Sequence, residues 1–280
     1  MPPDERPAPP GPRLLVVRRA VTVTPGLRRI TLGGPALAGF PPGCDGAHLK
    51  LLLPRPGQLR PELPRPGPDG LVWPSAARKP VVRTYTVARH DPVPGELDID
   101  FVLHAAPGPA ADWAARARPG DEVGIAGPGG PPRFAADAGF HLLFGDLSAA
   151  ALIAAVLRQL PAGARGHAVI AVDDPADCRV LPQRGALDLR WIVRGRPGAD
   201  GFAGLLDAWD GLPRPPGATL SATLAGEHAE VVALRRRALA AGVARERLYA
   251  VPYWKSDADE EGYHAERHRV MDELDATPLA

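Results

Sequence analysis

A tyrosine flanked by threonines and preceded by an arginine forms the segment Arg83-Thr84-Tyr85-Thr86. The segment lies in a run of β-forming residues after a stretch rich in proline and glycine, so we expect it on a strand. In barrels that bind flavin, such a tyrosine ring can lie against the isoalloxazine, a threonine hydroxyl can bond its edge, and an arginine can neutralise the pyrophosphate. A tyrosine that alternates along a strand is also common in cores and on surfaces, so this motif alone leaves both roles open.

A second candidate is the segment 108–113 (GPAADW), where glycine and small residues open a predicted helix over 111–117. Backbone N–H groups at a glycine-rich turn and at a helix N-terminus bind phosphate groups. Trp113 lies within one turn of that position. The alternative is a plain connection between a barrel strand and a helix.

The sequence predicts no metal site. Cys44 and Cys178 stand alone, with no cysteine or histidine at ligand spacing, which also argues against a disulfide scaffold. His264 and His268 have the i,i+4 spacing of a ligand pair, but they lie in a charged tail with no third ligand nearby. That setting favours an exposed helix face.

The elements that must position these residues begin with runs of alternating apolar and polar residues, bounded by glycine and proline. Such runs predict strands of an antiparallel barrel, here over 14–24, 27–32, 48–53, 81–88 and 97–104. The proline-rich stretch 54–80 is expected to be a long surface loop. The prediction for this half is a six-stranded antiparallel β-barrel over 13–133.

From residue 134 onward, short apolar runs alternate with helical patterns, which is typical of a parallel sheet with helices on both faces. Predicted strands cover 140–144, 168–172, 187–193, 219–224 and 248–254, and predicted helices cover 147–160, 202–209 and 227–241. The expected second domain is an α/β, nucleotide-binding-like unit over 134–280, with a charged tail after residue 256 that would form a loose helix.

Composition narrows the function classes. Of the 280 residues, 45% are hydrophobic, and 33 basic residues nearly balance 32 acidic ones. Such a chain can bury a large core, and it has no basic surplus for nucleic acid. No secretory signal is visible at the N-terminus, and the longest apolar stretch, 147–157, is too short to span a membrane. We therefore expect a soluble, cytoplasmic protein that neither binds nucleic acid nor inserts into a membrane.

Five segments, taken in order, resemble the siderophore-interacting protein family, flavin-dependent ferric-siderophore reductases that are similar to the ferredoxin-reductase superfamily. The segments are RTYT, DIDFVLH, GPAADWAARARPGDEVGIAGPGG, LAGEHAEVVALRRRAL and VPYWK, and the resemblance covers residues 14–255. It implies FAD held by the barrel and a reduced pyridine nucleotide, NAD(P)H, bound by the α/β half. The implied activity is reduction of ferric siderophores, with release of Fe(II) in iron acquisition.

The resemblance also implies roles for individual residues. On the flavin side these are Arg83, Thr84, Tyr85, Thr86, Asp100, Val102, His104, Gly108, Pro109, Ala110 and Trp113. On the nucleotide side they are Gly145, Asp146, Ser148, Gly226 and Glu227. Two of them have simple structural alternatives: His104 as a polar residue at a strand end, and Glu227 as a carboxylate favoured by the dipole at a helix N-terminus.

Basic residues beside the flavin are implied for the ferric siderophore, the expected small-molecule partner, because such complexes are usually anionic. The chain has only three lysines, and two of them, Lys50 and Lys255, lie where the family has basic residues. Arg133, just after the GPGG turn, is a third candidate. Any of the three could instead be an ordinary solvated surface charge. We expect Lys50 and Lys255 to face one shared opening beside the flavin.

The chain departs from the family pattern at several positions. After the first α/β strand the family usually has Gly-Asp-Glu-Thr-Ala-Leu-Pro-Ala, whereas this chain has Leu147 in place of the acidic residue and lacks the proline. Ala88 replaces an arginine (although Arg89 follows), Ala111 replaces a hydroxyl residue, and Thr223 replaces an aromatic one. The alternative function is therefore a flavin-binding relative with an altered or lost nucleotide site, acting in biosynthetic tailoring or ligand binding.

Overall fold

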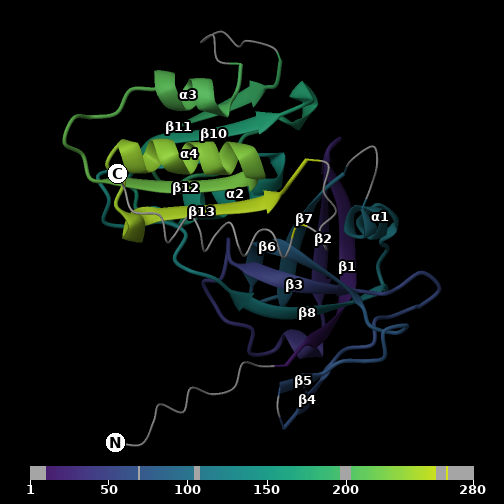
Figure 1. Ribbon diagram of the computed structural model, residues 1–280. Helices are drawn as coiled ribbons and strands as arrows, with labels where there is room; N and C mark the ends of the chain where they lie inside the picture. Colours follow the sequence, from purple (N-terminus) through teal and green to yellow (C-terminus); the bar gives the residue numbers. More distant parts are fainter. Residues whose placement is uncertain (1–10, 69, 104–107, 196–202, 257–262, 264–280) are drawn as a thin grey trace, which may run out of the picture.

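The computed structural model describes residues 11–68, 70–103, 108–195, 203–256 and 263, and it contains a closed barrel and a parallel sheet (Figure 1). The barrel strands are β1 (Arg13–Thr24), β2 (Leu27–Gly33), β3 (His48–Leu53), β6 (Val81–Asp91), β7 (Glu96–Val102) and β8 (Glu122–Gly129). They close in the order β1-β2-β7-β6-β3-β8, and every neighbouring pair is antiparallel. The predicted six-stranded antiparallel barrel is confirmed.

The alternation that predicted the barrel strands is visible in their burial. On β7, Leu97, Ile99 and Phe101 are fully buried in the barrel core, and the residues between them point the other way. The prediction of a long surface loop over 54–80 was wrong in part, because this stretch contains a hairpin of β4 (Arg65–Gly67) and β5 (Gly70–Val72). Helix α1 (Pro109–Arg116) begins two residues earlier than expected.

The second half contains the parallel strands β9 (Phe140–Asp146), β10 (Arg165–Val172), β11 (Ala186–Val193), β12 (Leu220–Glu227) and β13 (Leu248–Trp254). Their order in the sheet is β11-β10-β9-β12-β13. The helices are α2 (Ala150–Gln159), α3 (Leu205–Gly211) and α4 (His228–Ala240). Short 3-10 turns cover η1 (Pro35–Leu37), η2 (Leu147–Ala149), η3 (Pro175–Asp177) and η4 (Arg245–Arg247). The predicted α/β architecture is confirmed.

Each face of the parallel sheet has its own core. Residues of α2 share one buried cluster with alternate residues of β9 and β10, and residues of α3 and α4 share another on the opposite face. The helix predicted from residue 202 begins at Leu205 instead, after an extended Gly204. The expected division of the chain at 133/134 falls between β8 and β9 and stays a prediction. The predicted tail helix, with His264 and His268, lies outside the described residues.

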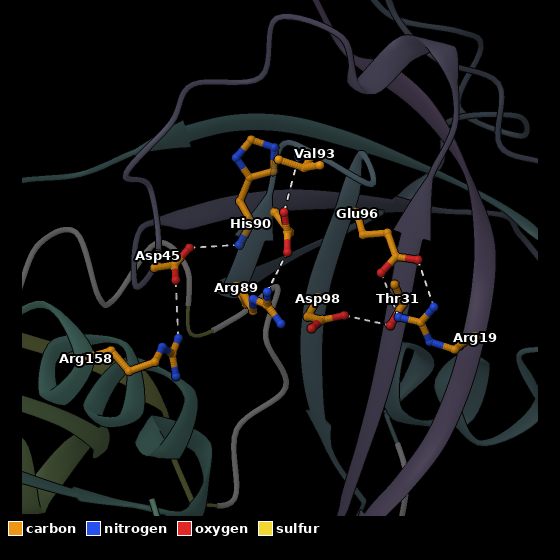
Figure 2. Close-up of polar contacts among 10 residues, drawn as sticks. Arg19, Thr31, Asp45, Arg89, His90, Val93, Glu96, Asp98 and Arg158 are labelled. Carbon is orange, nitrogen blue, oxygen red and sulfur yellow. Dashed lines mark hydrogen bonds and ion pairs between the residues drawn. The ribbon is translucent and has the colours of Figure 1, made fainter. Parts of the chain in front are cut away.

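Asp45 lies where the barrel and the α/β half meet (Figure 2). Its carboxylate accepts hydrogen bonds from the backbone N–H of His90 (2.8 Å) and from the guanidinium of Arg158 on α2 (3.3 Å). Arg158 also donates to the carbonyl of Ala88 on β6 at 2.6 Å. These bonds fix α2 against β6, so the relative position of the two halves is set by polar contacts as well as by packing.

Within the described ranges, every helix falls short of the length and apolar character that crossing a bilayer requires. The same ranges contain no group of three or more histidine, cysteine or carboxylate side chains arranged to hold a metal ion.

His141 on β9 is fully buried, and neither ring nitrogen has a hydrogen-bond partner among the described residues. Burial lowers its pKa below the ordinary value of 6.5. As the pH falls below that value, the unfolded chain takes up a proton that the folded chain refuses. The free energy of unfolding therefore falls, by up to about 1.4 kcal/mol per pH unit.

Replacing His141 by Leu removes this titration. Between a pH of about 7.5 and about 5.5, the native protein should lose roughly 1 kcal/mol more stability than His141→Leu. Denaturant titrations of both proteins at each pH measure the difference, since all other ionisable groups are shared. Equal losses would show that His141 titrates alike in the folded and unfolded chains.

Candidate functional site

Strand β6 presents Tyr85 and Thr86 to opposite sides, as alternation requires. The ring of Tyr85 packs against the barrel core, 4.4 Å between centroids from Phe101 on β7, and Phe101 lies 5.8 Å from Trp113 on α1. The three rings thus join β6, β7 and α1. This contact places two residues of the sequence-based flavin set, Tyr85 and Trp113, against one side chain.

The other face of β6 carries Thr84 and Thr86, and it is turned toward neighbouring elements. Lys50 on β3 donates from Nζ to the hydroxyl of Thr84 at 2.6 Å. Thr86 bonds through its hydroxyl to the phenol of Tyr253 on β13 at 3.2 Å. Burial raises the pKa of Tyr253, so the phenol stays protonated at neutral pH. The Arg83 guanidinium donates to the carbonyl of Val82 at 2.8 Å.

Asp100 on β7 is engaged by a neighbour within the barrel. Its nearly buried carboxylate receives two bonds from the guanidinium of Arg29 on β2, at 2.7 and 2.8 Å. Such a two-point pair fixes both side chains. Val102 ends β7 opposite Leu27. His104 lies outside the described residues, so its role stays a prediction.

The N-terminus of α1 fits a phosphate group. Gly108 is the extended N-cap residue, no side chain among the described residues caps the helix, and Pro109 occupies its first turn. No described atom lies within 4 Å of the point where a Cβ on Gly108 would stand. Backbone N–H groups there can be approached closely, and they carry the positive end of the helix dipole. Ala110 is buried beneath this turn.

In the parallel sheet, the strand order reverses direction between β9 and β12. Strands added after β9 extend to one side through β10 and β11, and those that follow extend to the other side through β12 and β13. Ligands of open α/β sheets bind outside the carboxyl ends of the strands at such a reversal. Gly145 and Asp146 end β9, and Gly226 and Glu227 end β12. Four of the five predicted nucleotide-side residues therefore lie at this edge, and the fifth, Ser148, follows β9 in η2.

Asp146 ties three strand ends together there. Its buried carboxylate accepts from the backbone N–H and hydroxyl of Ser148 (2.8 and 2.5 Å), the N–H of Glu227 (2.8 Å) and the indole of Trp254 (2.8 Å). Burial raises the pKa of Asp146, and these donors oppose that rise. Because all of the donors belong to the protein, Asp146 and Ser148 shape the sheet edge.

Gly226 lies against that carboxylate. Its φ is 135°, and a Cβ at this position would stand 2.7 Å from Oδ2 of Asp146. At Gly145, a Cβ would stand 2.4 Å from the carbonyl of Ala225 and 2.5 Å from Cβ of Ala149. Only glycine fits at either position, because atoms of Ala225, Ala149 and Asp146 already fill the space that a Cβ would need.

Glu227 caps helix α4. Its carboxylate accepts from the N–H groups of Ala229 (2.6 Å) and Glu230 (3.2 Å). This arrangement matches the structural alternative stated for the residue, a carboxylate that satisfies a helix N-terminus. The Glu227 backbone N–H, by contrast, belongs to the network around Asp146.

The three predicted substrate residues lie in different surroundings. Lys50 shares a face with Thr84, and Lys255 follows the last residue of β13, two positions after Tyr253. Thr84, which binds Lys50, is two residues from Thr86, and Lys255 is two residues from Tyr253, so both lysines are linked to the Thr86–Tyr253 contact. Arg133 instead lies between the halves, with Cδ 3.5 Å from the point where a Cβ on Gly46 would stand. The carbonyl of Arg133 accepts a hydrogen bond from the Thr223 hydroxyl at 2.6 Å. Thr223 stands where the family has an aromatic residue.

Sequence reasoning noted Tyr253 and Trp254 only as part of a motif and gave neither a role. They are adjacent on β13, yet Tyr253 bonds to the barrel and Trp254 bonds to Asp146 at the sheet edge. No spacing rule could have found these contacts, because the partners are 167 and 108 residues away in the chain.

The residues present therefore fit a flavin dinucleotide on the barrel and a second nucleotide at the sheet edge. The evidence is the N-terminus of α1, which no described side chain caps, and the reversal of the strand order at the ends of β9 and β12. The strand that contacts both regions is β13.

Both halves of the chain match families of known proteins. Residues 16–132 match the siderophore-interacting FAD-binding domain family, and residues 138–257 match the siderophore-interacting protein family. Ferric vibriobactin reductase ViuB of Vibrio cholerae is 40% identical over 264 residues, which are 94% of this chain and 96% of that protein. The NADPH-dependent ferric-chelate reductase of Escherichia coli K12 is 30% identical over 246 residues, which are 86% of this chain and 92% of that protein.

A solved structure agrees. The siderophore-interacting protein SipS from Aeromonas hydrophila superposes with a TM-score of 0.76 at 38% identity, over 94% of this chain and 98% of that one. The family matches span both halves of the chain, and these relatives cover nearly all of it. The chain belongs to the siderophore-interacting protein family.

Proposed function

We propose that this protein is an FAD-dependent reductase that uses NAD(P)H to reduce ferric siderophores and release Fe(II). The observation that carries the proposal is the pair of adjacent residues on β13. Tyr253 contacts the barrel face that bears the flavin motif, and Trp254 contacts the sheet edge where a nucleotide would bind. A hydride donor and a flavin can therefore be held against one another.

Bound FAD would supply a group that accepts a hydride and passes on single electrons. The chain's own residues bind and orient it. Arg83 and the N-terminus of α1 would hold the phosphates, and Tyr85 would lie against the ring system. The Thr86 hydroxyl, held by Tyr253, would bond the ring edge. Val102 and Ala110 line the strand end and helix turn beside it.

The reduced nucleotide would bind at the ends of β9 and β12, where Gly145 and Gly226 allow the two strand ends to pack closely. Asp146 and Ser148 position Glu227 and Trp254 around it. The iron needs no protein ligand, because the siderophore supplies its coordination shell. Since reduced nicotinamide nucleotides belong to the cell interior, we place the reaction in the cytoplasm.

Steady-state assays test this proposal. Without oxygen, continuous oxidation of NADPH or NADH should require both FAD and a ferric siderophore, and a ferrous chelator should trap Fe(II) in step with that oxidation. A protein that binds FAD but oxidises neither nucleotide would favour the alternative, a relative active in tailoring or ligand binding. The intact Gly145–Ser148 turn argues against that alternative despite Leu147, which packs into the core.

Replacing Lys50 and Lys255 together by Ala tests the substrate side. Two ammonium groups attract an anionic complex from a distance, so we expect the apparent KM for an anionic ferric siderophore to rise about tenfold at low salt. Its dependence on ionic strength should flatten, because the screened charges are gone.

The rate of flavin reduction by the nucleotide serves as the control in the same double variant, and we expect it to stay within about twofold of native. Unaltered KM and salt dependence would contradict the substrate assignment and leave the flavin assignment intact. Arg133→Ala is a useful comparison. We expect Arg133→Ala to lower stability with little effect on KM, because Arg133 packs between the two halves.

A further inference from the structure

The hairpin of β4 and β5 exposes an unusual concentration of apolar side chains. Among the described residues, half of the large hydrophobic side chains that are exposed lie in 54–80: Leu59 (96% exposed), Val72 (60%), Leu71 (45%) and Trp73 (40%). Single exposed apolar residues are normal on proteins, but a cluster of them marks an interaction site. Figure 1 shows the hairpin at the bottom, with the barrel between it and the parallel sheet.

Both faces of the hairpin are apolar. β4 and β5 pair with each other and form a separate two-stranded sheet. Side chains alternate along a strand, so Leu71 lies on one face of β5 and Val72 on the other, and Trp73 directly follows the strand. A protein partner would cover one face of the hairpin and leave the other face exposed to water. The interfacial zone of a lipid bilayer surrounds an inserted hairpin and covers both.

Basic residues accompany these apolar ones. Exposed Arg65 lies opposite Val72 in the hairpin, and Lys79 Nζ lies 4.9 Å from the centre of the Trp73 ring. Over 54–80 the sequence has five basic residues and two acidic ones, within a chain that is nearly neutral. Tryptophan and leucine beside arginine and lysine are the combination that binds anionic membrane surfaces.

The hairpin is also held in place, which reduces the entropy lost on binding. Proline occupies eight positions between 54 and 80 and restricts the backbone. Arg55 donates from Nε to the carbonyl of Lys79 at 2.6 Å and so joins the two ends of the segment. Leu63 packs against Gly124 on β8, which anchors the segment to the barrel.

We propose that this hairpin docks the protein on an anionic lipid bilayer, with Leu71, Val72 and Trp73 in the interfacial zone and Arg65 and Lys79 at the headgroup phosphates. The contact is peripheral and does not depend on the reductase activity. It would hold the protein at the membrane surface with the parallel sheet directed away from it.

Vesicle sedimentation with the full-length, FAD-supplemented protein tests the proposal. The native protein should partition onto phosphatidylglycerol-containing vesicles about tenfold more than onto pure phosphatidylcholine vesicles, and high salt should weaken it. Leu71→Ser/Trp73→Ser should lose about tenfold in partitioning. The matched control Val93→Ser/Val180→Ser, at positions 93% and 89% exposed elsewhere, should bind as the native protein does. Arg65→Gln/Lys79→Gln should lose binding to anionic vesicles and its salt dependence.

Reductase activity on a soluble ferric siderophore and the melting temperature should stay native in all of these variants, which shows that each is folded. Two results would overturn the proposal. The first is equal partitioning of the native protein and Leu71→Ser/Trp73→Ser, or none at all. The second is retention on immobilised polyglutamate without vesicle binding, which would indicate an acidic protein as the partner.

Discussion

Gly226→Ala should slow flavin reduction by NAD(P)H about a hundredfold or more while FAD stays bound, because a misplacement of about 1 Å at a reacting site has effects of that size. The new Cβ would stand 2.7 Å from the Asp146 carboxylate, in a backbone region (φ 135°) that side chains rarely adopt. The Asp146 carboxylate must then move and lose hydrogen bonds from Ser148, Glu227 or Trp254. We also expect the free energy of unfolding to fall by about 3 kcal/mol.

Gly34 provides a matched control. Its φ is 130°, and no described atom lies within 4 Å of the point where its Cβ would stand. Gly34→Ala therefore carries the backbone cost alone, about 1–2 kcal/mol, and should reduce the flavin at the native rate. Stopped-flow absorbance and denaturant titration measure both quantities. A native rate of flavin reduction in Gly226→Ala would contradict the placement of the nucleotide at this sheet edge.

Arg29→Ala should have the next largest effect, on stability. It leaves the nearly buried Asp100 carboxylate without its two-point partner. Breaking a buried ion pair costs about 3–5 kcal/mol, and we expect about 2–3 here because Arg29 is partly exposed. The positive charge of Arg179 also acts on Asp100 and offsets part of the loss. Denaturant unfolding measures the change.

The double variant Arg29→Gln/Asp100→Asn separates the two roles open to Asp100. If the pair is structural, this variant should recover most of the lost stability and bind FAD within about twofold of native. A large loss of FAD affinity in Asp100→Asn, without a matching loss of stability, would show that the carboxylate binds the cofactor as the family resemblance implies.

Most of the architecture could be predicted from local patterns. Alternation on β7 and helical periodicity in α2 and α4 are properties of short stretches, and burial in this structure follows them. The β4–β5 hairpin was missed because its strands have three residues each and contain proline and glycine. Such short strands carry no detectable period.

The sequence predicted which residues lie at the site better than it predicted the role of each residue. Gly145, Asp146, Ser148, Gly226 and Glu227 do meet at one edge, because strands of a parallel sheet all end on the same side. The sequence could not show that Asp146 is saturated by protein donors, since these come from three separate segments. The Glu227 carboxylate likewise accepts hydrogen bonds from N–H groups of its own helix.

Electron transfer from nicotinamide through FAD to ferric iron is the central step of the proposed function. The decisive measurement is an anaerobic stopped-flow experiment that follows the flavin absorbance of the FAD-loaded protein. NADPH or NADH should bleach the flavin, and adding a ferric siderophore should restore the oxidised spectrum with two ferric complexes consumed per nicotinamide. A flavin that neither nucleotide bleaches, or that stays bleached in the presence of the ferric complex, would contradict the proposed function.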